Sequence, residues 1–203
     1  MDNKLLRPFE KGVDQECEGI SRLKERSEFR DPTDWAIYQA KIFYEGFGDI
    51  EKAIEILEAE QTRVPQDANV MFCLAECYSR TSGRLVRAVE LCTTGLSIDA
   101  TSDYGYTIKA RTQLALGRPI DCYQSAMEAL RRNMYNFEAA IYLGIVGFAI
   151  ARADENEEEM RLSIQNLRLT QECFPQSRMV ARLIKENEMW LAEFLGTGSE
   201  SAG

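Results

Sequence analysis

Cysteine is the residue type in this chain best placed to do chemistry, because six cysteines are present and histidine is absent. Without histidine there is no common general base, no Ser-His or Cys-His nucleophile pair and no histidine-containing zinc site. Cys73 and Cys77 lie one helical turn apart, but a tetrahedral zinc site needs two further ligands and no CxxC motif supplies them. We therefore predict structural thiols, with no bound metal and no cofactor.

Two other segments have compositions that catalytic or phosphate-binding sites use. The run Glu157–Glu159 is interpreted as an exposed carboxylate cluster, without a dry pocket and without the spacing of a calcium loop. Gly46-Phe47-Gly48 lacks the lysine and the strand of a phosphate loop, so it is interpreted as a turn. We expect no enzymatic activity.

Charge and hydropathy exclude two classes of partner. The formal net charge is −9, whereas nucleic-acid and anionic-membrane binders carry a basic surface. The longest apolar stretch, residues 139–151, is much shorter than the ~20 residues of a membrane-spanning helix. The first residues do not form the apolar core of a signal peptide, so reduced cysteines in the cytoplasm are expected.

Small residues recur along the middle of the chain with a period of 34 or 35 residues. One series consists of Lys41, Ala75, Ala110 and Gly144, and a second of Ala53, Ala88 and Cys122. Two antiparallel helices approach closely only where the side chains at their crossing are small. Two such series at a constant offset predict one helical hairpin per period, stacked repeatedly.

The chain can be divided around this periodic region. Residues 1–33 are predicted to form an N-terminal amphipathic helix, at Phe9–Leu23, and a linker; residues 34–175 form four hairpins. In the fourth, the small residue Ser163 lies 41 residues after Cys122, and the extra length is assigned to a lengthened acidic turn at residues 152–159. Residues 176–195 are a capping helix, and residues 196–203 a disordered tail.

The repeated pattern resembles the tetratricopeptide repeat (TPR) family. Its best copy runs through Met71, Leu74-Ala75, Tyr78, Gly83, Ala88 and Gly95-Leu96, and Pro65 and Pro175 match the closing proline. Lys41, Lys109, Gln113 and Gly147 depart from the family pattern. The resemblance implies an all-α, right-handed TPR-like solenoid of helical hairpins.

In TPR proteins the first helix of each hairpin lines a concave groove that binds another protein. Carried over residue by residue, the resemblance assigns partner binding to Trp35, Tyr38, Ile42, Phe72, Glu76, Arg80, Tyr104 and Arg111. Ile141, Ile145 and Phe148 occupy the same face of the fourth hairpin, with packing against the C-terminal helix as the alternative. Such a groove suits a peptide or helix with apolar anchors and some acidic character.

These expectations describe a non-catalytic interaction module, acting as an adaptor or a dedicated chaperone. Tyr38 and Ile42 replace the Lys and Asn with which one TPR subclass holds the carboxylate of heat-shock chaperones. The acidity, size and apolar groove are similar to those of bacterial type III secretion chaperones. The alternative from another class is a structural subunit that self-assembles into a homo-oligomeric scaffold.

Overall fold

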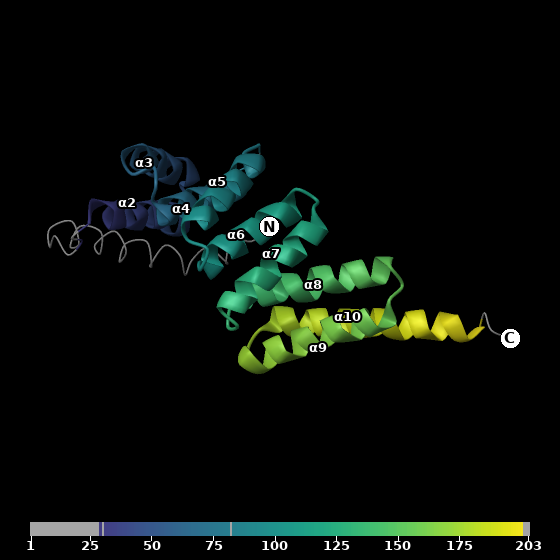
Figure 1. Ribbon diagram of the computed structural model, residues 1–203. Helices are drawn as coiled ribbons and strands as arrows, with labels where there is room; N and C mark the ends of the chain where they lie inside the picture. Colours follow the sequence, from purple (N-terminus) through teal and green to yellow (C-terminus); the bar gives the residue numbers. More distant parts are fainter. Residues whose placement is uncertain (1–28, 30, 82, 201–203) are drawn as a thin grey trace. The chain divides into compact units, whose positions relative to one another are not determined.

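The structure, a computed structural model, describes residues 29, 31–81 and 83–200, and all regular secondary structure in these residues is helical. The elements are α2 (Pro32–Lys41), the π-helix η1 (Ile42–Gly46), α3 (Ile50–Arg63), α4 (Ala68–Ser79), α5 (Leu85–Ile98), α6 (Asp103–Ala115), α7 (Pro119–Arg132), α8 (Phe137–Ala153), α9 (Glu157–Cys173) and α10 (Arg178–Glu200). Figure 1 labels the α-helices along the chain. The N-terminal helix predicted at Phe9–Leu23 lies outside the described residues. In the described part, no helix combines the length and hydropathy that crossing a bilayer requires.

Each helix packs mainly on its neighbour in sequence, so the chain forms successive hairpins. The contacts divide it into two compact units, one ending at Asp99 and the other beginning at Ala100. The first unit contains the hairpins α2–α3 and α4–α5. The second contains α6–α7 and α8–α9, followed by α10, which packs on α9 and α8. The predicted all-α fold of helical hairpins is confirmed.

Short polar side chains begin most of these helices. The side-chain oxygens of Asp49, Asp67, Ser102 and Asn136 each accept a hydrogen bond from a backbone N–H in the first turn that follows, at 3.0 Å. Such caps satisfy N–H groups that have no partner within the helix. They fix where each helix starts, and therefore the length of each hairpin.

Small side chains fill the helix crossings, as the period predicts. Ala53, Ala75, Ala88, Ala110 and Cys122 are completely buried. The first period is one residue out of register, because the small residue is Ala40, 1% exposed, and not Lys41. The π-helix η1 follows at once, with Phe47 N–H donating to the Ile42 carbonyl, and the wider turn absorbs the additional residue.

The extra length of the fourth hairpin lies in its helices and not in its turn, which corrects the prediction. α8 and α9 have 17 residues each, whereas α6 has 13 and α7 has 14. These differences of four and three residues account for the longer period. The acidic run forms the first turn of α9, where carboxylates are favoured by the helix dipole.

The C-terminal capping helix is longer than predicted. α10 extends to Glu200, so the helix continues five residues into the segment assigned to a disordered tail. Its apolar face packs on the fourth hairpin through Leu191, Trp190 and Phe194. The last hairpin of a stack requires such a cover, because no further hairpin shields its apolar face from solvent.

Candidate partner-binding face

The predicted binding residues lie on the first helices of three hairpins. Trp35 and Tyr38 are on α2, and Ile42 begins η1. Phe72 and Glu76 are on α4, and Arg80 is its C-cap. Tyr104 and Arg111 are on α6, in the second unit.

Trp35 and Tyr38 belong to an aromatic cluster on α2. Their ring centroids lie 5.9 Å apart, and the Phe29 ring lies 5.4 Å from Trp35 and 5.1 Å from Tyr38. Both α2 residues are half-buried, so part of each ring faces solvent. Phe29 was not predicted from the sequence, because it lies before the first repeat.

A second group joins α4 to η1 through Arg80. The guanidinium is 3.1 Å from the carboxylate of buried Glu76 and 5.4 Å from the centroid of the Tyr44 ring, while the Arg80 side chain stays 46% exposed. Burial raises the pKa of the Tyr44 hydroxyl, as does its hydrogen bond to Glu45, so Tyr44 stays neutral. The guanidinium therefore contacts both Glu76 and Tyr44 while part of its side chain stays open to solvent.

The second unit contains the same three residue types around Arg111. Its guanidinium nitrogen Nε lies 3.2 Å from the Glu138 carboxylate of α8. The Tyr142 hydroxyl donates to the same carboxylate at 2.8 Å, and burial raises the pKa of Tyr142. Tyr104 is half-buried two turns before Arg111 on α6. Glu138 and Tyr142 come from the following hairpin, so single-helix periodicity could not identify them.

Phe72 belongs to the core and not to a binding face, which corrects the prediction. It is 0% exposed, and its ring lies where a Cβ on Gly95 would come within 2.6 Å of Phe72 Cε1. The repeat-equivalent residues Thr107 and Ile141 are also buried. This position in the hairpin therefore packs helices together. Glu76 is buried too, and it contributes by orienting Arg80.

The apolar residues of the fourth hairpin are covered by the C-terminal helix. Phe148 is buried and meets the Trp190 ring edge-on, with centroids 6.0 Å apart and planes at 88°. Ile141 is buried, and Ile145 packs in the same cluster with Leu183. The alternative that these residues pack against the last helix is confirmed.

Comparisons of the whole structure identify the fold. The chain is similar to a thermophilic TPR protein of Thermus thermophilus, with a TM-score of 0.65 and 16% identity over 90% of this chain and 98% of that one. The fold is that of a tetratricopeptide repeat protein. No family model and no curated protein matches the sequence.

Two further TPR-fold matches have comparable scores. The MamA protein has a TM-score of 0.61 at 17% identity, over 81% of this chain and 87% of that one. A tetratricopeptide repeat protein from Parabacteroides merdae has a TM-score of 0.60 at 13% identity, over 98% of this chain and 75% of that one. At these identities the similarity establishes the TPR fold alone.

The thiols of this TPR fold are mostly structural. Cys73, Cys77, Cys92 and Cys122 are buried, and Cys173 is exposed. Burial raises the pKa of Cys77 to about 12 and that of Cys122 to about 11, so both are weak nucleophiles at neutral pH. Among the described residues no three cysteine or carboxylate side chains converge as a metal ion would require.

Proposed function

We propose that the protein is a non-catalytic interaction module that binds a partner polypeptide on the first helices of its hairpins, as an adaptor or a dedicated chaperone. The TPR fold supports this proposal at the level of protein class. Free thiols throughout the described residues fit a reducing compartment, so we place the protein in the cytoplasm.

The observation that carries the proposal is the arrangement around Arg80. Its guanidinium is ion-paired to buried Glu76 and lies over Tyr44, yet nearly half of the side chain is exposed. Holding a long side chain in one orientation costs conformational entropy before any ligand arrives. A ligand carboxylate would therefore meet a cation that is already positioned.

The aromatic cluster on α2 supplies the apolar part of the same unit's surface. Partly exposed tryptophan and tyrosine rings are frequent anchors at protein interfaces, because they bury large areas and lose little entropy. The combination of Trp35, Tyr38 and Arg80 suits a peptide or helix with an apolar anchor and an acidic residue. Arg111 and Tyr104, two turns apart on α6, provide the same types of side chain on the second unit.

Reversing the charge at Arg80 tests this proposal. The Arg80→Glu variant is expected to bind its partner at least about tenfold more weakly, because a carboxylate would then face the partner's acid. Partners would be identified by affinity capture from the native cells with mass spectrometry, and their affinity for each variant would then be measured by titration.

The matched control is Arg87→Glu on α5, the second helix of the same hairpin. Arg87 is exposed and pairs with Glu90 at 2.9 Å, so its reversal alters the net charge equally. Equal loss of affinity in both variants would mean that net charge, and not the first-helix face, governs binding. Capture only of further copies of the chain would favour the self-assembling scaffold.

A further inference from the structure

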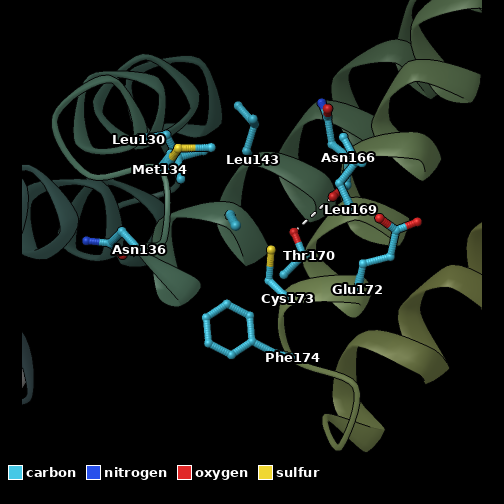
Figure 2. Close-up of a pocket in the computed structure, with 11 residues that line it drawn as sticks. Leu130, Met134, Asn136, Leu143, Asn166, Leu169, Thr170, Glu172, Cys173 and Phe174 are labelled. Atoms are coloured by element: carbon cyan, nitrogen blue, oxygen red, sulfur yellow. Dashed lines mark hydrogen bonds between the residues drawn. The ribbon is translucent and has the colours of Figure 1, made fainter.

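An apolar pocket of about 340 Å³ opens in the second unit between the ends of α7, α8 and α9. Figure 2 shows its lining, which includes Leu130, Met134, Leu143, Leu169 and Cys173. Met134 is 73% exposed and Leu169 is 51% exposed. Large apolar side chains thus stand in solvent around an apolar cavity, an arrangement typical of binding sites.

The corresponding position in the preceding hairpin shows why this pocket exists. The helix caps define the correspondence, because Ser102 caps α6 as Asn136 caps α8, and Asn133 follows α7 as Phe174 follows α9. Equivalent residues are therefore 34 apart in the first helices and 41 apart at the ends of the second helices.

In the α6–α7 hairpin this corner is filled by Arg132. Its guanidinium lies 4.0 Å from the centroid of the Tyr106 ring, and its Nε donates to the Ala100 carbonyl at 2.6 Å. It also pairs with Glu128 at 2.7 Å. Beside it, the Asn133 amide donates to the Asp103 carboxylate at 2.9 Å. Polar and aromatic side chains of the chain itself occupy the corner.

In the α8–α9 hairpin each of these residues is replaced by an apolar or smaller one. The replacements are Ala140 for Tyr106, Cys173 for Arg132, Leu169 for Glu128, Phe174 for Asn133 and Phe137 for Asp103. The last two form a ring contact, with centroids 4.5 Å apart, in place of the hydrogen bond. Ala140, Leu169, Cys173 and Phe174 all line the pocket. The cavity is the space that a tyrosine ring and a guanidinium fill in the other hairpin.

We propose that this pocket binds one large apolar side chain, aromatic or long aliphatic, of a partner peptide that carries lysine or arginine beside that anchor. The size of the missing tyrosine and arginine side chains sets the size of the anchor. The apolar lining sets its chemistry, since a polar group there would lose its hydrogen bonds to water. Among the described residues that line the pocket, Glu172 alone is charged, and its exposed carboxylate favours a basic neighbour. The pocket is lined by other residues than those of the proposed function, and the inference does not depend on that function.

Alkylation of Cys173 can report whether the pocket is occupied, because Cys173 is the one exposed thiol among the described cysteines. In the full chain with Cys17→Ser, the rate of Cys173 alkylation by N-ethylmaleimide is followed by intact mass. The probes are short lysine-flanked peptides that differ only in a central Trp, Leu or Ala, together with an aspartate-flanked Trp peptide. At about twice its dissociation constant, the lysine-flanked Trp peptide should slow alkylation about threefold. The Leu peptide should protect less, and the other two should not protect.

Refilling the corner should abolish binding of the same peptide. Ala140→Tyr restores the ring of the other hairpin, and Leu169→Gln replaces a 51% exposed apolar residue of the lining by a polar one without adding a charge. Fluorescence anisotropy of the dye-labelled Trp peptide should show loss of binding to both variants. Ala181→Tyr, an exposed alanine on α10, should bind as the parent protein does.

Three results would overturn the proposal. In the first, all lysine-flanked peptides protect Cys173 equally; in the second, none protects. In the third, Cys173 becomes protected with rising protein concentration in the absence of peptide, in parallel with dimer formation in sedimentation. That result would assign the pocket to a second copy of the chain.

Discussion

Phe72→Ala is expected to lower the free energy of unfolding by about 3–5 kcal/mol, the largest effect of any substitution considered for this protein. The Phe72 side chain is fully buried at the crossing of α4 and α5. Its removal leaves a cavity that backbone atoms of Gly95 cannot fill. Urea denaturation followed by far-UV circular dichroism would measure the loss. Phe47→Ala is the matched control, because Phe47 is 42% exposed, and its cost should stay below about 1 kcal/mol.

The contact between Phe72 and Gly95 can be isolated with a double-mutant cycle. Gly95→Ala places a Cβ against the Phe72 ring and should destabilise the parent protein. In a Phe72→Leu background the smaller side chain leaves space for that Cβ. The cost of Gly95→Ala should therefore fall by about 0.5–3 kcal/mol. Strictly additive effects would show that the two residues are not in contact, and Phe72 would return to the candidate binding face.

Gly144→Ala should destabilise the protein by about 1–3 kcal/mol, although alanine is the better helix former. A Cβ at position 144 would lie 2.4 Å from Leu167 Cγ, and Leu167 is completely buried. Gly196→Ala is the control, because nothing lies within 4 Å of a Cβ there. That substitution should leave stability unchanged or raise it by up to about 1 kcal/mol. Thermal denaturation of the two variants gives the comparison.

If both alanine variants are equally stable, small side chains do not determine how closely α8 and α9 approach. The periodic series that predicts the hairpins would then have no packing basis. A loss of stability in Gly144→Ala alone would support close packing of α8 on α9 through small side chains. The Phe72 and Gly95 variants test the same packing in the first unit.

The hairpins could be predicted from the sequence because their determinants are local and repeated. Alanine, glycine and cysteine mark the crossings, and turn glycines such as Gly83 and Gly117 adopt positive φ between successive helices. The register error at Lys41 has a physical reason. The π-helical turn η1 adds one residue to the first hairpin, and the sequence has no signal for such a turn. The repeat spacing is therefore 34 residues when counted from Lys41 and 35 when counted from Ala40, and both values fit the period. The sequence does not show where α8 ends, because the turn between α8 and α9 contains no glycine. Glu155 takes the left-handed conformation there, with φ of 51°.

The candidate site was less predictable, because its geometry depends on residues that are distant in sequence. Periodicity placed Arg80 and Arg111 on first helices. It could not show that Glu76 turns inward to hold Arg80, or that Glu138 reaches Arg111 from another hairpin. The resemblance assigns Phe72 to the groove by its position in the repeat. Its packing partner, Gly95, has no side chain that could signal the contact in the sequence. The sequence does contain a signal for the apolar pocket, because Cys173 stands 41 residues after Arg132 at the equivalent position. That signal can be interpreted only when the structure shows what Arg132 contacts in the α6–α7 hairpin.

The central claim, that first helices hold a partner polypeptide, is tested most directly by site-specific photo-crosslinking in the native cells. A photoreactive amino acid would replace Tyr38 in one variant and Arg87 in another. We expect the probe at position 38 to form a covalent adduct with a polypeptide other than the chain itself, and the probe at position 87, on the second helix of its hairpin, not to do so. Adducts only between copies of the chain, or the same adducts from both positions, would contradict the account.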